Sequence, residues 1–315
     1  MKVLVTGGAG FIGSNVCDAL QAAGHEPVAL DNLTTGRREN LSNGIRLIEA
    51  DIRDPELADI FERERPEAVS HHAAQIDVRK SVADPVHDAE VNLLGLLRVL
   101  EASVKVGVRR FLFASSGGAC YGEQEAFPAP EGNPTRPVSP YGASKAAGEL
   151  YLGYYRAERA LSFAALRYAN VYGPRQDPHG EAGVVAIFAQ RLLRGQQCTI
   201  FGDGENTRDF VYVGDVARAN VLALTAGATG ALNIGTGRET SINDLYRKLA
   251  RAAGSELAAM YAPPKPGEQR RSVIDPALAA KALGWKPRLS LEEGLIQTID
   301  WFRREGSRLG PIPHL

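Results

Sequence analysis

The sequence predicts an α/β fold, with a Rossmann-type doubly wound parallel sheet and a smaller mixed α/β lobe for a substrate. Three observations predict it: short apolar runs alternate with helical segments over the first half of the chain, a glycine-rich turn follows the first run, and an acidic residue ends the second. Such alternation is typical of a parallel sheet with helices on both faces. We expect a dinucleotide-binding domain over residues 1–168. Residues 169–315 form mainly the substrate lobe, with some segments, such as 231–234, returning to the sheet.

The amino-terminal segment predicts a phosphate-binding turn. A short apolar run at 2–6 is followed by glycine at every third position, at Gly7, Gly10 and Gly13. Glycine lets the backbone turn tightly and approach a pyrophosphate, whose charge lies on the amides and positive dipole of the helix that follows. That helix is expected to run to about Ala23. Gly24 would end it, because glycine accepts the left-handed backbone of a helix stop.

An acidic residue follows the second predicted strand. The run at 27–30 ends in Asp31, about twenty residues after the glycines. An acid at this distance binds the adenosine ribose hydroxyls and repels a 2′-phosphate, so the sequence favours NAD over NADP. Arg37 and Arg38 follow closely and weaken that preference.

The remaining elements continue the alternation. We expect strands at 45–49, 68–71, 109–114 and 162–166, and helices at 55–65, 84–106 and 140–160. Ligands of parallel sheets bind beyond the carboxyl ends of the strands. Asp51, the pair Ala73–Ala74 and the pair Ser115–Ser116 all follow predicted strands. They are therefore expected to meet the glycine turn at that edge.

The helix that begins at Pro140 carries a tyrosine and a lysine four residues apart. Ser139 can cap this helix, and proline suits its first position. Tyr141 and Lys145 then lie on one face. A fixed positive charge near a phenol lowers the phenol pKa from about 10, which is one way to obtain a tyrosine base near neutral pH. The alternative is an ordinary amphipathic helix with a surface tyrosine and lysine, and the upstream glycine turn favours the catalytic interpretation.

Composition narrows the possible partners. The 315 residues are 44% hydrophobic and 23% charged, with a net charge of −1, so nothing indicates a nucleic-acid partner or an anionic membrane surface. Cys17, Cys120 and Cys198 are isolated and lack metal-ligand spacing, which is typical of a reducing cytoplasm. His71 and His72 would point to opposite faces of a strand, so we interpret them as structural and expect no metal. We also expect neither a signal peptide nor a membrane span.

Six motifs are distributed along nearly the whole chain. They are TGGAGFIG at 6–13, DNL at 31–33, SSGGACYG at 115–122, Tyr141-x-x-x-Lys145, RYANVYGPR at 167–175 and RDFV at 208–211. Together they resemble the extended short-chain dehydrogenase/reductase family, in its NAD-dependent epimerase/dehydratase branch, and more closely the UDP-hexose 4-epimerases. The resemblance implies NAD contacts at Gly7, Gly10, Phe11, Ile12, Gly13, Asp31, Asn32, Asp51, Ile52, Ala73, Ala74, Asn92, Tyr141 and Lys145.

The resemblance also implies a chemistry. Tyr141 would remove the proton of the sugar 4-hydroxyl while hydride passes to NAD, and the 4-keto sugar would turn over and take the hydride back on its opposite face. NAD is regenerated in place, so the protein should hold it tightly. Lys145 would lower the tyrosine pKa and bind the nicotinamide ribose. Ser116 would orient the 4-oxygen, and Ser115 is the alternative. This sequence has one more residue between its serines and Tyr121 than some family members. Aligning the motif from Tyr121 would therefore place Gly117, which has no hydroxyl, at this position.

Two glycines argue for the reaction type. Related 4,6-dehydratases carry an Asp-Glu pair after the Ser/Thr, and decarboxylating relatives often carry a glutamate nearby. Here the positions are Gly117 and Gly118, which offer no carboxylate for acid–base chemistry. Epimerisation needs none.

The second half of the chain matches the family's substrate contacts. The implied set is Asn170 and Arg208 at the diphosphate, Phe201 on the uracil, Glu268 at the uridine ribose, Arg270 as a second phosphate contact, and Ser272 beside the sugar 2-substituent. Guanidinium groups suit phosphate oxygens, and a serine leaves room for an N-acetyl group. The substrate is therefore expected to be a UDP-hexose, with UDP-N-acetylhexosamine or UDP-glucuronate as alternatives.

Two further expectations concern the whole protein. The helices at 84–106 and 140–160 would form the shared bundle of a homodimer, as in this family, or else only cover the sheet. An alternative from another functional class is a non-catalytic regulator that binds NAD(H). The joint presence of Ser116, Tyr141 and Lys145 argues against it, because a regulator has no need of all three.

Overall fold

A seven-stranded sheet forms the centre of the computed structural model, which describes residues 1–178, 183–264 and 269–305. The strand order is β11-β6-β5-β4-β1-β2-β3, and all of these neighbours pair in parallel. The strands are β1 (Lys2–Thr6), β2 (Glu26–Asp31), β3 (Arg46–Glu49), β4 (Ala68–His71), β5 (Arg110–Ser116), β6 (Ser162–Tyr168) and β11 (Gly230–Ile234). The order reverses between β1 and β4, where doubly wound sheets bind their ligands. The predicted fold class is confirmed.

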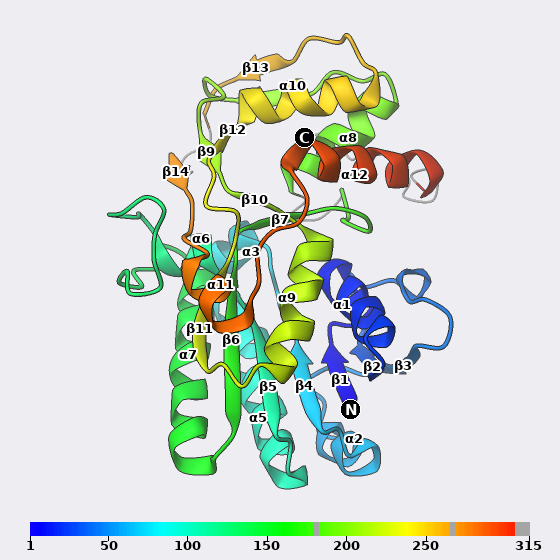
Figure 1. Ribbon diagram of the computed structural model, residues 1–315, viewed down its shortest axis with the longest axis vertical. Coiled ribbons are helices and arrows are strands. Elements are labelled where there is room, and N and C mark those ends of the chain that lie inside the picture. Colours follow the sequence, from blue (N-terminus) through cyan, green and yellow to red (C-terminus); the bar gives the residue numbers. More distant parts are fainter. Residues whose placement is uncertain (179–182, 265–268, 306–315) are drawn as a thin grey trace.

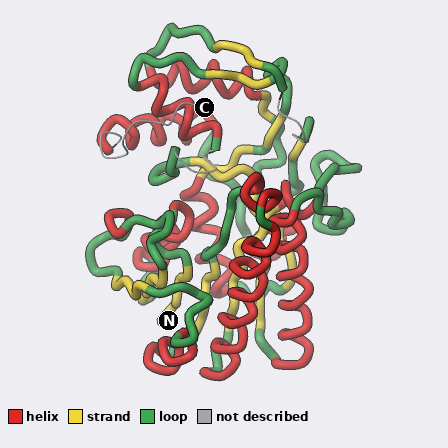
Figure 2. Tube along the Cα trace, turned by 180° about the vertical axis from the view of Figure 1, so that it is seen from behind, coloured by secondary structure: helices red, strands yellow, loops and turns green. Residues whose placement is uncertain are grey.

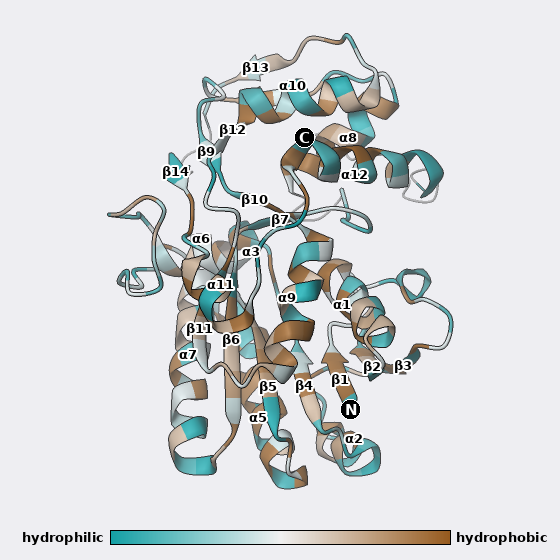
Figure 3. Cartoon of the chain, in the orientation of Figure 1, coloured by the Kyte–Doolittle hydropathy of each residue, from teal (hydrophilic) through white to brown (hydrophobic). Residues whose placement is uncertain are grey.

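Helices cover both faces of this sheet (Figures 1 and 2). One face packs against α1 (Phe11–Ala22), α9 (Val213–Thr225) and α11 (Ala277–Leu283). The other packs against α2 (Leu57–Glu64), α5 (Gly95–Val106) and α7 (Pro140–Arg159). The helices carry hydrophobic and hydrophilic residues in alternating bands (Figure 3), as expected for helices with one face on a core.

A second, smaller lobe lies over the carboxyl ends of the strands (Figure 1). Its core joins α8 (Val184–Leu193), α10 (Ile242–Ala253) and α12 (Leu291–Glu305). Short strands complete it: β7 (Asn170–Tyr172), β8 (Thr199–Phe201), β9 (Thr207–Arg208), β10 (Phe210–Tyr212), β12 (Thr240–Ser241), β13 (Met260–Ala262) and β14 (Arg271–Ser272). The chain returns from this lobe to the sheet through α9 and β11, so the expected return of residues 231–234 is found.

The segment expected to be helical at 84–106 is helical from Pro85 to Val106, so this prediction is confirmed, with a π-helical turn in its middle. It consists of α4 (Pro85–Ala89), a π-helical turn η2 (Glu90–Leu94) and α5, and it follows α3 (Val78–Ala83). Asp84 ends α3 and caps α4 by accepting a hydrogen bond from the His87 amide, and Pro85 occupies the first helical position. The π turn is a feature that often marks functional sites.

Two further short helices complete the described structure. The 3₁₀ turn η1 (Arg38–Asn40) follows the segment after β2, and α6 (Gly117–Tyr121) follows β5 directly.

Candidate active site

A cavity of about 1080 Å³ opens where the carboxyl ends of the sheet strands meet the second lobe. The lobe contributes Gln176 and, from the end of α12, Trp301. The sheet side contributes thirteen of the residues predicted to contact NAD: Gly7, Gly10, Phe11, Ile12, Gly13, Asp31, Asn32, Asp51, Ile52, Ala73, Ala74, Tyr141 and Lys145. Thirteen of the fourteen predicted NAD contacts therefore lie on the wall of one cavity.

The glycine turn forms a cradle that side chains would fill. Gly7 has φ +65°, and a Cβ there would lie 2.6 Å from the Ala73 amide nitrogen. A Cβ on Gly13 would lie 2.1 Å from the carbonyl oxygen of Gly7. Such contacts exclude any other residue without a shift of the backbone. Because α1 begins directly after Gly10, its amides and positive dipole end face the cavity, which suits a dinucleotide pyrophosphate.

Asp31 lies at the ribose end of this cradle. Its carboxylate accepts hydrogen bonds from the amides of Ala9 at 3.0 Å and Leu33 at 2.9 Å, and burial raises its pKa. Both neighbouring arginines pair with other acids: Arg37 lies 3.8 Å from Asp177, and Arg38 lies 3.0 Å from Glu49. The two cations are thus partly neutralised, which strengthens the preference for NAD.

Asp51 is held in place by two neighbours. Arg53 donates to both of its oxygens at 2.9 and 2.8 Å, and Asn32 donates at 2.8 Å. The hydrogen bonds from Arg53 hold the pKa of the Asp51 carboxyl well below its usual range. This residue therefore stays ionised and fixed at the cavity wall.

Asn92 is the one predicted NAD contact that does not line the cavity. It is 3% exposed and lies in the π turn. Its amide accepts from the Gln75 amide and donates to the Gln75 carbonyl, both at 2.8 Å, and it donates to Asp88 at 2.9 Å. Gln75 does line the cavity, so Asn92 positions that segment from behind. The sequence interpretation missed Gln75. Its position shortly after β4 could have indicated that it lies at the cavity.

Tyr141 and Lys145 occupy the first turns of α7, as predicted. Ser139 accepts from the Gly142 amide at 3.2 Å, and Pro140 begins the helix. Lys145 is only 3% exposed, so the alternative of a tyrosine and a lysine on the helix surface does not hold for it. Its Nζ donates to the Ala114 carbonyl at 2.8 Å and lies 5.8 Å from the centre of the Tyr141 ring. Burial lowers the pKa of Lys145 to about 8.

The two serines at the end of β5 have different environments. Ser115 is 3% exposed, and its hydroxyl donates to Glu149 at 2.6 Å. Ser116 is half-buried, and its oxygen accepts from the Ala119 amide at 3.3 Å, which leaves its own proton available to donate. The cavity lining includes Ser115 and not Ser116. We favour Ser116 as the substrate contact, because the Ser115 hydroxyl is already used and Ser116 leads directly into α6, next to the second lobe.

Strand pairing gathers three of the predicted substrate residues. Arg208 of β9 and Ser272 of β14 are register partners, and the Asn170 amide donates to the Asp209 carbonyl at 2.9 Å. Ser272 is 5% exposed, and its hydroxyl oxygen would lie 3.3 Å from a Cβ on Gly118. These strands therefore meet α6 beside the end of β5.

The remaining substrate candidates lie farther out in the lobe. Phe201 ends β8, and Arg270 precedes β14. Arg270 is exposed and pairs through two nitrogens with Asp203, at 2.8 and 3.0 Å. A phosphate at Arg270 would have to compete with that carboxylate. Glu268 lies outside the described residues.

Both histidines of the adjacent pair are packed side chains. The Nδ1 of His71 lies 2.8 Å from the Thr6 hydroxyl, and the Nε2 of His72 lies 2.9 Å from the Ser70 hydroxyl. The His72 ring stacks on Tyr168. In the described part of the chain, no group of three or more His, Cys, Asp or Glu residues could hold a metal ion. Nor does any described helix have the length and apolar character to cross a membrane.

These two rings predict a loss of stability in acid. Burial lowers the pKa of His72 to about 3 and that of His71 well below its usual value, so both stay neutral in the folded protein. The unfolded chain binds a proton at each below pH 6.5. The free energy of unfolding should therefore fall by about 1.4 kcal/mol per pH unit for each ring as the pH drops below about 5.5, until the folded pKa is reached.

Urea unfolding at several pH values checks this contribution. His72→Phe keeps the stacking shape and removes one titrating group, so its stability should depend less steeply on pH than that of the wild type, by about 1.4 kcal/mol per unit between pH 5.5 and 4. Equal slopes in the two proteins would contradict the assignment.

A comparison with known families places the chain in one of them. The model of the NAD dependent epimerase/dehydratase family matches residues 3–235. The chain belongs to this family. The epimerase is 47% identical over 311 residues to a UDP-glucose 4-epimerase of Mycolicibacterium smegmatis, covering 97% of this chain and 99% of that one.

Two crystal structures of other epimerases superpose on it. A UDP-glucose 4-epimerase from Thermotoga maritima with UDP-glucose has a TM-score of 0.94 at 50% identity, and one from Thermus thermophilus with NAD has 0.91 at 51%. Each covers 96% of this chain and 99% of its own. The cavity assigned to NAD therefore belongs to an NAD-dependent nucleotide-sugar 4-epimerase.

Proposed function

We propose that this epimerase interconverts UDP-glucose and UDP-galactose. The observation that carries the proposal is Lys145, buried next to Tyr141 at the wall of the NAD cavity. Gly117 and Gly118 place no carboxylate where dehydration or decarboxylation would need one. The relatives named UDP-glucose 4-epimerase support the same choice of substrate.

The chain supplies a base, a cation and an orienting hydroxyl. Tyr141, as phenolate, accepts the proton of the sugar 4-hydroxyl, and after the 4-keto sugar has turned over it returns the proton to the oxygen. Lys145 favours the phenolate by its positive charge. Ser116 donates a hydrogen bond to the same oxygen and holds it toward Tyr141. When bound, NAD supplies the reversible hydride acceptor at C4.

The nucleotide end of the substrate is proposed to lie in the second lobe. Arg208 binds the diphosphate through its guanidinium, and Asn170 contacts the diphosphate and sugar from β7. Phe201 packs on the uracil. Arg270 is a second phosphate contact once it is released from Asp203. Glu268 remains a predicted contact to the uridine ribose.

A second substrate class is favoured by Ser272. Its small side chain lies against Gly118, at the position that borders the 2-substituent in the resembling epimerases. Serine is smaller than the tyrosine that excludes an N-acetyl group at this position in the resembling epimerases, which supports acceptance of that group. We propose that UDP-N-acetylglucosamine and UDP-N-acetylgalactosamine are also interconverted.

A panel of UDP-sugars tests both proposals. The purified protein is incubated without added cofactor, and the products are identified by chromatography and NMR. Conversion of UDP-glucose to UDP-galactose is expected, and conversion of UDP-N-acetylglucosamine would confirm the second substrate class. Inactivity on the N-acetylated pair alone would remove the Ser272 argument. A protein that retains NAD but converts no UDP-sugar would instead be the regulator.

We further propose that the enzyme is a homodimer in the cytoplasm. Large apolar side chains are exposed on α3, α4, the π turn and α7: Val82, Val86, Leu94, Leu150, Tyr151 and Tyr154. Leu150 is 78% exposed, and the elements that carry the other side chains, α3, α4 and the π turn, all contact α7. A second copy would bury these side chains. The three buried, unpaired cysteines are typical of a reducing compartment.

Light scattering tests the dimer. Leu150→Glu places a charge among these side chains without disturbing the sheet, so the measured mass should fall from two chains to one. A wild-type mass of one chain would contradict the proposal, and Met260→Glu, on the other lobe, provides the exposed control.

A further inference from the structure

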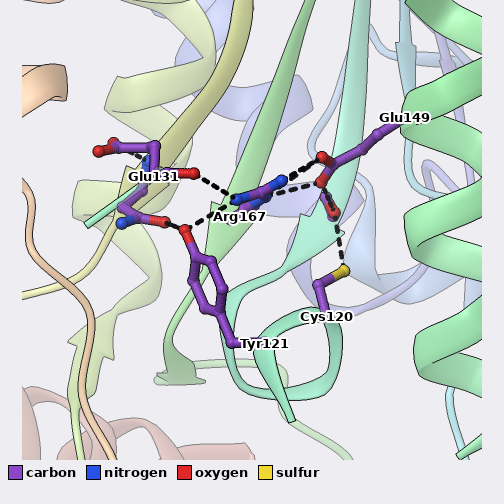
Figure 4. A network of polar contacts seen from close by, with 7 residues as sticks. Cys120, Tyr121, Glu131, Glu149 and Arg167 are labelled. Atoms are coloured by element: carbon purple, nitrogen blue, oxygen red, sulfur yellow. Dashed lines mark hydrogen bonds and ion pairs between the residues drawn. The ribbon is translucent and has the colours of Figure 1, made fainter. Parts of the chain in front are cut away.

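A buried ion pair lies next to the end of β5 and has no part in the chemistry proposed above. Glu149 of α7 and Arg167 of β6 have side chains that are 11% and 7% exposed. Two guanidinium nitrogens of Arg167 donate to the carboxylate, at 2.9 and 2.6 Å (Figure 4). Neither residue lines the NAD cavity. Replacing such a pair with apolar residues often leaves a protein equally stable, so stability alone does not explain it.

On the helix side, the pair docks α7 onto β5. Tyr141, Lys145 and Glu149 follow one another at intervals of four and share a helix face. Lys145 holds the Ala114 carbonyl at 2.8 Å, and Glu149 holds the Ser115 hydroxyl at 2.6 Å. Two successive turns of α7 therefore bind two successive residues of β5, Ala114 and Ser115, directly before Ser116.

On the strand side, the pair reaches the far end of α6. Arg167 donates to the Tyr121 hydroxyl at 2.8 Å, and its guanidinium lies 4.9 Å from the centre of that ring. Tyr121 is the last residue of α6, and it donates in turn to Asn233 of β11 at 2.8 Å. Ser116 caps the first turn of the same helix. The short helix α6 is thereby fixed at both ends. Ser116 lies between the contacts of α7 with β5 and the contact of Arg167 with Tyr121.

We infer that Glu149 is a positioning residue for the 4-epimerisation: through Ser115 and through Arg167 with Tyr121, it fixes the Ser116 hydroxyl relative to Tyr141. The inference rests on the proposed function, in which both hydroxyls bind one sugar oxygen. Each of these hydrogen bonds needs about 2.6–3.2 Å between its oxygens. A misplacement of about 1 Å by a residue outside the reaction lowers the rate by about a hundredfold.

The charge of Glu149 also acts on Lys145. The groups that face this lysine are Asp88 from α4, Cys120 from α6, His71 at the end of β4, His72 directly after it, and Tyr141 and Glu149 on its own helix. Burial lowers the pKa of Lys145, whereas Cys120, Asp88 and Glu149 oppose that shift. Without the Glu149 charge, Lys145 loses its proton at a lower pH. The alkaline limb of the rate profile should then move toward neutral.

Glu149→Gln tests the inference, because it keeps the shape of the side chain and removes the charge. The expected result is a kcat about 10- to 100-fold below the wild type, with KM for UDP-glucose and the content of bound NAD within twofold. The alkaline limb should move to lower pH. Glu149→Asp keeps the charge but is one methylene too short to reach Ser115. Its pH–rate profile should keep the alkaline limb of the wild type, whereas its kcat should still be reduced.

Leu152→Ala is the matched control for stability. Leu152 is fully buried on the next turn of α7, so its truncation destabilises the same helix without touching Ser115. It should unfold more easily and retain kcat. If Glu149→Gln itself does not fold, the double variant Glu149→Gln/Arg167→Met removes both charges, and it too should lose kcat with unchanged KM.

A crystal structure of Glu149→Gln separates this inference from the proposed function. The distance between the Ser116 and Tyr141 hydroxyl oxygens should change by about 1 Å, and this readout requires no turnover. An unchanged distance, or a kcat within twofold of the wild type, would overturn the positioning role. Failure of the wild type on every UDP-sugar would overturn only the proposed function.

Discussion

Replacing Tyr141 by phenylalanine is expected to lower kcat by about a thousandfold or more while the protein keeps its bound NAD. The variant retains the ring at the cavity wall and loses only the oxygen that accepts the proton of the sugar. General acid–base groups contribute about 10² to 10⁴ to the rate, and Gly117 and Gly118, directly after Ser116, offer no carboxylate to replace this one. Steady-state assays on UDP-glucose give kcat, and the nucleotide released on denaturation gives the NAD content.

Tyr155→Phe is the matched control. Tyr155 lies on the same helix, is 4% exposed and donates to Glu101 outside the cavity. Its loss should affect stability and leave kcat near the wild type. Substantial turnover by Tyr141→Phe would mean that another group takes the proton, and the mechanism would have to be abandoned.

Local signals in the sequence predicted the sheet and which strand ends line the cavity. The run before Gly7, the helix after Gly10 and the acid at the end of β2 are each set by neighbouring residues, and a parallel sheet brings its strand ends together. Thus Asp31, Asp51 and Ala73 could be assigned to one edge before their contacts were known. The cap of α7 by Ser139 is equally local and was predicted correctly.

Contacts between distant segments could not be predicted in this way. In the sequence, Glu149 is an ordinary polar residue on an amphipathic helix, and only the fold shows that β6 brings Arg167 against it. Its spacing of four residues from Lys145 was the one local signal for its position. The π turn within the helix at 85–106 has a similar origin, because it turns Asn92 toward Gln75 and Asp88. The apolar pattern of that segment is continuous, so periodicity alone predicts one helix.

The substrate residues depended most on family resemblance. Arg208 and Ser272 are separated by a segment that includes α9, β11 and α10, yet they are partners in a sheet of two-residue strands. Strands this short carry no periodic signal. The motif around Arg208 identified it, and the structure adds that Ser272 lies between Arg208 and Gly118.

Replacing Gly13 by alanine is expected to weaken NAD binding by about a hundredfold or more, which corresponds to about 2.7 kcal/mol. The added Cβ would lie 2.1 Å from the Gly7 carbonyl oxygen and 2.8 Å from its carbon, and both belong to backbone that cannot rotate away. The turn must open, and its amides then leave the positions that hold the pyrophosphate. Because hydride leaves and returns within one active site, turnover should fall with the fraction of enzyme that retains NAD, and added NAD should restore it.

Gly153→Ala distinguishes this effect from the general consequence of placing a methyl group in a helix. Gly153 lies in α7, and a Cβ added there would have no neighbour within 4 Å, so alanine should stabilise the helix by about 0.5–1 kcal/mol and leave NAD untouched. Calorimetric titration of NAD into both proteins gives the two affinities. Equal affinities would mean that the turn relaxes without losing its phosphate contacts. The tight spacing of the three glycines would then serve the packing of α1 on β1 rather than the cofactor.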